Sequence, residues 1–279
     1  MNEKNNPVIT VVTVVLNAEK HIEKTILSVI NQTYQNIEYI VIDGGSTDGT
    51  LNIIKKYQDK ITFWKSEPDE GIFDAMNKGI DIATGVWINF MNAGDYFYSD
   101  DVLERIFQDK EIKEDFIYGG TLVNFHIGKY ISRKEMSAPE LTDELWKYYP
   151  CHQSCFIRTV LMKQNLFKVN DPVLKVLADC DILLDFYYKK KLKFRRENII
   201  VANFLGGGFS SAIVFENPTF SGVNLKINRW KLISRYINHF KVHIYYILML
   251  ARTLILIILL KFIPDVFKLK IFQKFYLFK

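Results

Sequence analysis

Polar turns that carry carboxylates interrupt the apolar runs of the first hundred residues, and one of them could bind a metal. In "INFMNAGDYF", residues 88–97, an apolar run stops at a turn that carries Asn92 and a single acid, Asp95. Mg²⁺ and Mn²⁺ need only one or two protein carboxylates when phosphate oxygens and water complete the coordination shell. Asp95 is therefore a candidate metal ligand, and the local alternative is an acid that caps a helix over residues 100–108.

A second turn, "VIDGGSTDGT", places glycines between a predicted strand and a predicted helix. Such turns can bind phosphate through backbone N–H groups, but the glycine spacing does not match the dinucleotide fingerprint GxGxxG. Asp43 and Asp48 would also repel a pyrophosphate. A carboxylate at a strand end suits a ribose hydroxyl or a base N–H better, and the alternative makes Asp43 and Ser46 turn and cap formers.

A third turn, "SEPDEGIFDAMNKG", crowds acids into the start of a predicted helix. Acids in the first turn of a helix complement its dipole, which accounts for Asp69 and Glu70. The dipole accounts less well for the close succession of Asp74, Asn77 and Lys78. These three residues are therefore candidates for ligand binding.

The three cysteines, Cys151, Cys155 and Cys180, are too few for a disulfide framework. Cys151 and Cys155 form a CxxxC spacing around His152, which suggests zinc, but no second ligand pair follows at zinc-finger spacing. Buried thiols are the preferred interpretation, and they favour a reducing, cytosolic compartment. The polar N-terminus "MNEKNNPVIT" also lacks the pattern of a signal peptide.

The elements that must position these turns alternate along the chain. Apolar strands are predicted over residues 8–16, 37–43, 61–65 and 86–91, with helical segments between them. Asn17 stands where the cap of the first helix belongs. This order implies a parallel sheet with right-handed crossovers, and such sheets bind ligands beyond the carboxyl ends of their strands. The polar turns described above lie at those ends.

Charge divides the chain into two parts. A length of 279 residues with 49% hydrophobic content suits one large α/β domain with an appendage. Residues 226–279 carry eleven Lys or Arg and one acid, a net charge of +10, whereas residues 1–225 carry 25 basic and 30 acidic groups, a net charge of −5. The two parts are therefore expected to have different roles.

The basic tail contains a mostly apolar stretch, residues 243–263, that is broken by Arg252. Its length approaches that of a transmembrane helix, but a central Arg is costly in a bilayer. Lying in the membrane interface, with basic groups at anionic headgroups, is the preferred interpretation. A helical pair packed on the large α/β domain or on another subunit is the alternative, and nucleic-acid binding is not expected.

Taken together, these segments resemble the family 2 glycosyltransferases with the GT-A fold, of the kind that build bacterial surface polysaccharides. The resemblance spans roughly residues 8–212. Its matching stretches are "TVVTVVLNAEKHIEKTILSVINQTYQNIEYIVIDGGSTDGT", "SEPDEGIFDAMNKGIDIATG" and "INFMNAGDYF", with weaker matches at "CHQSCFIR", "ADCDILLDF" and "GGGFSS". It implies an α/β fold with a Rossmann-like, mostly parallel sheet flanked by helices, followed here by a basic and apolar helical tail.

The resemblance implies a nucleotide-sugar donor, usually a UDP-sugar, that lies across the first strands. Thr13 and Asn17 match positions that line the nucleotide site, and Asp43 matches the acid that contacts the uracil or the ribose. The other predicted donor-binding residues are Ser46, Asp74, Asn77, Lys78 and Asn92.

Two acids carry the chemistry that the resemblance implies. The family's metal motif, often Asp-x-Asp-Asp, reads NAGD at residues 92–95, so Asp95 matches the metal-ligand role and the diphosphate supplies further ligands. The family's catalytic base lies in a Glu-Asp pair at the start of a helix. Here Ala178 replaces the Glu, and Asp179 matches the base. The alternative for Asp179 is a solvated acid in the first turn of a helix.

The sequence therefore predicts a metal-dependent, inverting glycosyltransferase that uses Mn²⁺ or Mg²⁺ and a glycan or polyprenyl-linked glycan acceptor. The predicted domains are a GT-A catalytic domain over 1–224, with its donor half at about 1–100 and its acceptor half at about 101–224, and a helical membrane-associating region over 225–279. The predicted location is the cytoplasmic face of the plasma membrane, as a peripheral or monotopic protein that could form homo-oligomers.

Two other classes of protein remain as alternatives. The first is a non-catalytic subunit of the same fold that binds a sugar nucleotide or acts as a scaffold. The second is a Rossmann dehydrogenase, which the missing GxGxxG disfavours.

Overall fold

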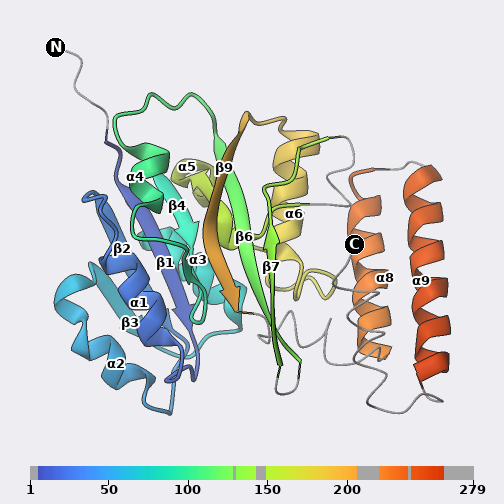
Figure 1. Cartoon of the computed structure of the whole chain (residues 1–279), viewed down its shortest axis with the longest axis horizontal. Helices are drawn as coiled ribbons and strands as arrows, with labels where there is room; N and C mark the ends of the chain where they lie inside the picture. Colours follow the sequence, from blue (N-terminus) through green and yellow to red (C-terminus); the bar gives the residue numbers. More distant parts are fainter. Residues whose placement is uncertain (1–5, 128–129, 143–148, 206–219, 238–239, 261–279) are drawn as a thin grey trace. The chain divides into compact units, whose positions relative to one another are not determined.

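The structure, a computed structural model, describes residues 6–127, 130–142, 149–205, 220–237 and 240–260. Within these residues a nine-stranded mixed sheet runs in the order β3-β2-β1-β4-β8-β6-β9-β5, with β7 paired to β6 (Figure 1). The strands are β1 (Ile9–Val15), β2 (Ile37–Asp43), β3 (Phe63–Ser66), β4 (Trp87–Phe90), β5 (Tyr96–Phe97), β6 (Phe116–Ile127), β7 (Tyr130–Met136), β8 (Cys155–Arg158) and β9 (Phe194–Leu205).

The first four strands form a parallel half of the sheet, joined by helical crossovers. β1 is buried along its whole length and lies between β2 and β4, with Ile9 opposite both Ile37 and Trp87. β2 pairs in parallel with β3. The predicted α/β organisation is confirmed, and the carboxyl ends of these four strands therefore meet at one edge of the sheet.

The other half of the sheet is antiparallel where it meets β4. β8 pairs antiparallel with β4, with Ile157 opposite Ile88, and antiparallel with β6, with Cys155 opposite Tyr118. The amino end of β8 therefore lies beside the carboxyl end of β4. This reversal brings the residues just before β8 to the same edge as the polar turns of the first four strands.

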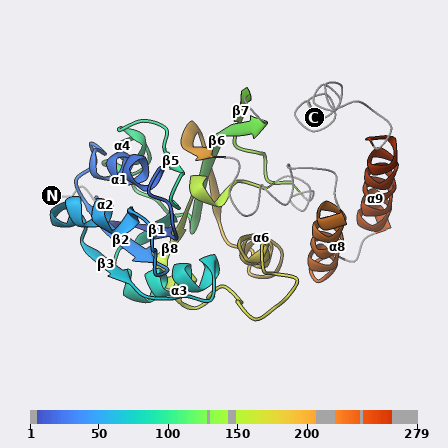
Figure 2. The same ribbon diagram turned by 90° about the horizontal axis from the view of Figure 1, so that it is seen from below.

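Helices cover both faces of this sheet, with α1 and α4 on one face and α3 on the other (Figure 2). α3 lies close to β1 because Gly79 has no side chain: a Cβ there would lie 2.5 Å from Cγ1 of Val12. The helices of this part are α1 (Ile22–Ile30), α2 (Thr50–Lys56), α3 (Ile72–Ile82), α4 (Val102–Phe107), α5 (Thr159–Lys163) and α6 (Ala178–Leu184), with the short helical turns η1 (Gln58–Lys60), η2 (His152–Ser154) and η3 (Asp185–Lys189).

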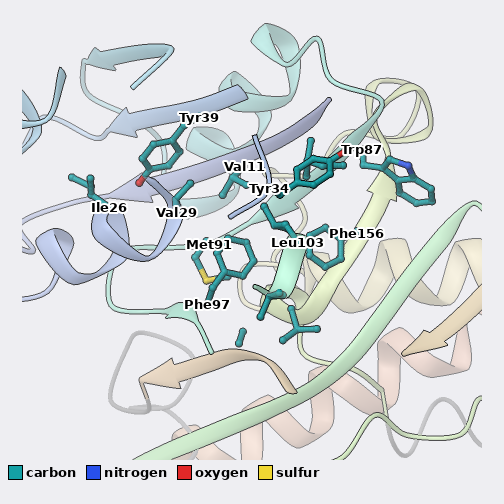
Figure 3. Packing of buried hydrophobic residues seen from close by; sticks show 14 of the residues in the cluster. Val11, Ile26, Val29, Tyr34, Tyr39, Trp87, Met91, Phe97, Leu103 and Phe156 are labelled. Carbon is teal, nitrogen blue, oxygen red and sulfur yellow. The ribbon is translucent and has the colours of Figure 1, made fainter. Parts of the chain in front are cut away.

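A hydrophobic core lies between the sheet and the helices on the side of α1 (Figure 3). Trp87 and Phe156 are almost fully buried, and both rings pack against Phe107, at centroid distances of 5.7 Å and 5.2 Å. Burial of such side chains contributes about 1.5–3 kcal/mol each, so this core fixes the strands whose ends carry the polar turns.

Element boundaries agree with the predictions to within a few residues, with one correction. Asn17 does not cap the first helix, because α1 begins only at Ile22, with His21 in the cap position. The carbonyl of Ala18 accepts the N–H groups of His21 and Ile22 at 2.9 Å each, so a turn separates Asn17 from the helix. Asn17 itself adopts a left-handed conformation with φ of 48°.

The chain divides into two compact units, and the second contains residues 124–134, 171–177 and 205–279. Its described helices are α8 (Phe220–Ser234) and α9 (Phe240–Leu260). The predicted boundary at residue 224 stays a prediction. The "GGGFSS" match and residues 261–263 of the apolar stretch lie outside the described residues.

α8 and α9 pack on each other through aromatic side chains. The indole N–H of Trp230 donates a hydrogen bond to Nδ1 of His243 at 3.0 Å, and the Trp230 and Tyr246 rings are parallel, with centroids 6.5 Å apart. Among the helices that the structure describes, none combines the length and the apolar character needed to cross a bilayer.

Candidate active site

The carboxylate of Asp43 ends β2 and organises the loops around it. The side chain is fully buried. Its Oδ2 accepts hydrogen bonds from the backbone N–H groups of Gly45 (3.1 Å) and Ser46 (2.9 Å) and from the hydroxyl of Ser66 (2.6 Å), and its Oδ1 accepts the Ser46 hydroxyl at 2.5 Å. Such charge-assisted bonds hold the ends of β2 and β3 together. The structure thus shows the turn-forming role for Asp43 and Ser46, while ribose or base contact stays a prediction.

Asn17 ties the end of β1 to the same loop. Its backbone N–H donates to Oγ of Ser46 at 2.8 Å, and its Oδ1 accepts the N–H of Thr47 at 2.8 Å. Asp48 forms an Asx turn ahead of α2, where its Oδ1 accepts the N–H of Thr50 at 3.0 Å. Asn17 is exposed at the edge where the nucleotide is expected.

Thr13 lies inside the sheet, two residues before the end of β1. It is fully buried, and its hydroxyl donates to the carbonyl of Met91 at 2.8 Å and lies 3.1 Å from the hydroxyl of Tyr39. In this conformation Thr13 has no exposed surface to offer a ligand. Its predicted role at the nucleotide site would therefore be indirect, through the strand that carries Asn17.

Asp74 and Lys78 fasten the turn between β3 and α3. Nζ of Lys78 lies 3.2 Å from Asp74 and 3.4 Å from Glu67, and it donates to the carbonyl of Pro68 at 3.1 Å. Burial by itself lowers the pKa of Lys78, but the two carboxylates outweigh burial and raise it above its ordinary value. Both residues lie at the edge of the site, and their contact with a donor stays a prediction.

Asn77 uses both ends of its amide on the backbone of Phe167. Its Nδ2 donates to the Phe167 carbonyl and its Oδ1 accepts the Phe167 N–H, each at 2.9 Å. The Phe167 ring packs against Phe73 and Phe90, with centroids 5.1 Å and 5.6 Å away. Asn77 therefore holds a distant segment against α3, which leaves its amide little capacity for a donor sugar.

The turn at residues 92–95 follows β4, as predicted, and holds Asp95 in place. The Asp95 N–H donates to the Asn92 carbonyl at 2.9 Å, and the Asp95 carbonyl accepts the Thr25 hydroxyl at 2.7 Å. The carboxylate is almost fully buried and accepts Nε2 of Gln153 at 2.8 Å. The capping alternative is wrong, because Tyr96 continues into β5 and α4 begins only at Val102.

Asn92 presents a buried acceptor in this turn. Its Nδ2 lies 3.2 Å from Nε2 of His152. Its Oδ1 is buried and has no hydrogen-bond partner among the residues that the structure describes. Buried carbonyl oxygens rarely lack a partner, so this atom is suited to meet a bound group.

Asp179 lies in the first turn of α6, as predicted, but it is not a solvated acid. Its Oδ2 lies 3.1 Å from Nδ1 of His152, its Oδ1 accepts the Cys180 N–H at 2.8 Å, and 26% of its side chain is exposed. Burial raises the pKa of Asp179, but the hydrogen bond and charge of His152 outweigh burial and bring it below its ordinary value. The carboxylate is therefore ionised at neutral pH.

The pKa of His152 moves in the opposite direction. Burial by itself lowers it, and the carboxylates of Asp179 and Asp95 together raise it above its ordinary value. Both shifts fit a His152 Nδ1–H that donates to the ionised carboxylate of Asp179.

His152 and Gln153 contact Asp179 and Asp95, and the sequence analysis did not predict either residue as part of this site. They stand in "CHQSCFIR", a stretch that matched the family only weakly. The available signal was a polar pair directly before a short apolar strand, and Gln153 is 3% exposed. Only the antiparallel pairing of β8 with β4 places this pair between Asp95 and Asp179.

The described residues contain no group of three or more His, Cys, Asp or Glu side chains that could hold a metal ion. The sulfhydryl of Cys155 donates to the carbonyl of Cys151 at 3.2 Å, and burial raises the pKa of the Cys151 thiol to about 11. Cys155 is buried and Cys151 is half-buried, and the thiol interpretation of the CxxxC spacing stays a prediction.

The strand order and the polar edge define a GT-A glycosyltransferase fold. One similar solved structure is S. aureus TarS 1-349 in complex with UDP-GlcNAc, with a TM-score of 0.59 and 19% identity over 88% of this chain and 71% of that chain. Another is the mannosyltransferase PcManGT from Pyrobaculum calidifontis in complex with GDP-Man and Mn²⁺, with a TM-score of 0.57 and 12% identity over 83% of this chain and 63% of that one. The predicted fold is confirmed.

The chain belongs to glycosyl transferase family 2, whose family model matches residues 10–166. The PGL/p-HBAD biosynthesis glycosyltransferase of Mycobacterium bovis (strain BCG / Pasteur 1173P2) is 31% identical over 252 residues, which cover 82% of this chain and 93% of the relative. An uncharacterized glycosyltransferase of Haemophilus influenzae is 39% identical over 104 residues, which cover 36% of this chain and 41% of the relative. The predicted family is confirmed.

Proposed function

We propose that this glycosyltransferase transfers a sugar, with inversion, from a nucleotide-sugar donor to a hydroxyl of a glycan or lipid-linked glycan. One observation carries the proposal: the adjacent residues His152 and Gln153 hold Asp179 and Asp95, which unites a predicted base and a predicted metal ligand in one site. The family membership and the PGL/p-HBAD biosynthesis relative support glycosyl transfer. A UDP-sugar is the proposed donor, because TarS was solved with UDP-GlcNAc.

Inversion needs a base on the acceptor side and no covalent enzyme intermediate. The ionised carboxylate of Asp179 takes the proton of the acceptor hydroxyl as its oxygen attacks the anomeric carbon. The bond from that carbon to the diphosphate oxygen breaks, and the electron pair leaves with the nucleoside diphosphate. A positioned base of this kind contributes about 10²–10⁴-fold to the rate.

Two oxygens of the 92–95 turn fit a divalent metal. The Asn92 Oδ1 is buried and meets no hydrogen-bond partner within the described part of the chain, and the Asp95 carboxylate lies in the same turn. Both are hard oxygen ligands, and Mg²⁺ or Mn²⁺ needs few protein ligands when phosphates and water complete the shell. Such an ion, when bound, offsets the charge that develops on the leaving diphosphate.

The experiment that tests the proposal needs no acceptor. Candidate nucleotide sugars are screened by thermal shift with Mn²⁺, since a donor that binds the folded state raises the melting temperature. Slow hydrolysis of the stabilising donor is then followed by ¹H NMR. We expect an α-linked donor to release the β-sugar first, and initial release of the α-sugar would contradict inversion.

The same assay separates the enzyme from a non-catalytic subunit of the same fold. A binding or scaffolding protein would show the thermal shift without turnover. Donor turnover that disappears in both the Asp95→Asn and the Asp179→Asn variants would exclude that alternative.

We propose in addition that α9 lies on the cytoplasmic face of the plasma membrane. Val242 and Tyr246 are buried, and the opposite face of the helix exposes an apolar stripe. The spacing of its members places them on one side of the helix, which belongs to the tail, residues 226–279, with a net charge of +10. Anionic lipid headgroups complement that charge. The stripe consists of Phe240, Ile244, Ile247, Leu248 and Leu254.

Flotation of the full chain with phosphatidylglycerol-containing vesicles tests this proposal. We expect the doubly substituted chain, Ile247→Glu with Leu248→Glu, to lose at least about tenfold of its vesicle affinity, because both apolar side chains leave the interface. Val160 on α5 is 60% exposed, so Val160→Glu is a matched control. Equal binding by all three proteins would exclude α9 as the contact.

A further inference from the structure

The imidazole of His152 is engaged on both sides. Nδ1 faces the Asp179 carboxylate at 3.1 Å, and Nε2 faces the Asn92 amide at 3.2 Å. The next residue, Gln153, donates to Asp95 at 2.8 Å. One short turn, η2, thus contacts both the turn after β4 and the start of α6.

The backbone of η2 is fixed to the sheet from two sides. From β4, the amide of Asn89 donates to the carbonyls of Gln153 (3.0 Å) and Cys155 (2.9 Å). From β6, Gly120 accepts the hydroxyl of Ser154 at 3.0 Å. Gln153 and Ser154 are 3% and 0% exposed. The ring of His152 therefore projects from a rigid support.

Asp179 has fewer supports of its own. Apart from His152, its carboxylate meets the backbone N–H and the side chain of the adjacent Cys180. Both contacts are local to α6 and do not relate the carboxylate to the sheet. His152 is thus the group that fixes the Asp179 rotamer with respect to the 92–95 turn.

We propose that His152 is a positioning residue, whose Nδ1–H orients the Asp179 carboxylate toward the acceptor while Gln153 orients Asp95. The proposal rests on the proposed role of Asp179 as the base. It assigns η2 the task of setting the separation between base and metal ligand. Transfer requires the reacting groups to be held within tenths of an ångström. A change in the separation between Asp179 and Asp95 should therefore slow the reaction.

His152 is poorly placed to be the base itself. Its Nε2 faces Asn92 and its Nδ1 faces Asp179, so neither ring nitrogen is open to an acceptor hydroxyl. Asp179 keeps a partly exposed side chain and lone pairs beyond those used by His152 and Cys180. The proton of the acceptor therefore goes to Asp179.

The test replaces His152 by Asn or by Gln, whose side-chain amides each mimic one nitrogen of the imidazole ring. The amide of Asn can place its NH₂ near the Nδ1 position, whereas the longer Gln places it near Nε2. His152→Asn should therefore keep the donor to Asp179, and His152→Gln should lose it. His152→Phe keeps the ring volume without any donor and serves if the Gln variant does not fold. His21 is exposed, so His21→Asn is the matched control.

We expect His152→Gln and His152→Phe to lower kcat by about 10–100-fold, with KM for the donor and UDP affinity within about twofold of wild type. His152→Asn should stay within about threefold of wild type. The acidic limb of the kcat profile should move to higher pH in the Gln variant, because burial then acts on Asp179 without the opposing hydrogen bond. A purely structural role would change melting temperature without moving that limb.

The outcomes separate this inference from the proposed function. If Asp179→Asn is inactive while His152→Gln keeps wild-type kcat, the positioning role is wrong and the base assignment stands. An Asn variant as slow as the Gln variant would also overturn the positioning role. If Asp179→Asn keeps wild-type kcat, the base assignment itself is wrong, and the role of His152 fails with it.

Discussion

Two acids, Asp43 and Asp179, lie at the same edge of the sheet, and their surroundings differ. Asp43, at the end of β2, is fully buried and its two oxygens accept four hydrogen bonds from the neighbouring loops. Asp179, at the start of α6, has 26% of its side chain exposed. Burial raises its pKa, but His152 outweighs burial and lowers it below the ordinary value. The first carboxylate holds loops together, and the second is ready to take a proton.

The comparison teaches that position at the ligand-binding edge does not by itself define a role. The side-chain amides of Asn77 and Asn92 also lie at this edge and differ in the same way. Both atoms of the Asn77 amide bind the backbone of Phe167, whereas the Asn92 Oδ1 is buried without a partner in the described residues. A side chain whose polar atoms are all hydrogen-bonded within the protein supports the fold. A side chain with an unused polar atom can bind a ligand.

The largest effect on stability is expected at Asp43. Asp43→Asn should lower the free energy of unfolding by about 3 kcal/mol, because an amide NH₂ then faces buried donors. Urea unfolding measures the change. Asp59 is exposed on η1, and Asp59→Asn should change stability by less than about 0.5 kcal/mol. A stable Asp43→Asn variant that fails only to bind UDP would move Asp43 into the ligand-binding group.

Asp95→Asn should affect catalysis more than folding. We expect donor turnover to fall by on the order of 100-fold, because charge on the leaving diphosphate is then less well offset. Calorimetry should show that Mn²⁺ no longer strengthens UDP binding. In wild type, EDTA should stop turnover and Mn²⁺ or Mg²⁺ should restore it, and full activity in EDTA would contradict the metal role.

Asn77→Ala sharpens the comparison between the two amides. We expect a loss of about 1–2 kcal/mol in unfolding free energy, since two hydrogen bonds to Phe167 disappear, with donor affinity nearly unchanged. Asn52 is exposed on α2, so Asn52→Ala is the control. A tenfold loss of donor affinity at unchanged stability would instead favour the predicted donor contact of Asn77.

The smallest effect concerns pH and stability. The folded-state pKa of Asp179 lies below its ordinary value of 3.8, so its ionised form adds stability that is fully present above pH 3.8. This contribution is lost as the pH falls through the lower folded-state pKa. Relative to Asp179→Asn, wild type should gain about 1 kcal/mol at pH 6, and the gain should vanish in strong acid. A constant difference across this range would contradict the ion pair with His152.

Much of the fold could be predicted because the first strands are locally consistent. β1 is a β-branched run buried on every side, and the turns after β1, β2 and β4 stand where a parallel sheet binds ligands. The sequence predicted correctly that Asn17 lies at the ligand-binding edge, but wrongly that it caps α1. The four residues before α1 form a turn that the helical periodicity did not reveal.

The centre of the candidate site was harder to predict because long-range pairing assembles it. Asp95 and Asp179 were found through the family resemblance, but their connection through η2 depends on β8 running antiparallel beside β4. Thr13 shows the converse, since a residue near a strand end can still point into the core. Patterns in a single sequence predict well where strands end, and they predict poorly which distant segments contact each other.

The central claim is that Asp179 acts in catalysis and not in donor binding. The most direct test measures donor turnover and UDP affinity in Asp179→Asn beside wild type. We expect a loss of about 10²–10⁴-fold in turnover, with UDP affinity within about twofold and a melting temperature that falls by no more than about 4 °C. Equal losses of turnover and UDP affinity, or turnover at the wild-type rate, would contradict it.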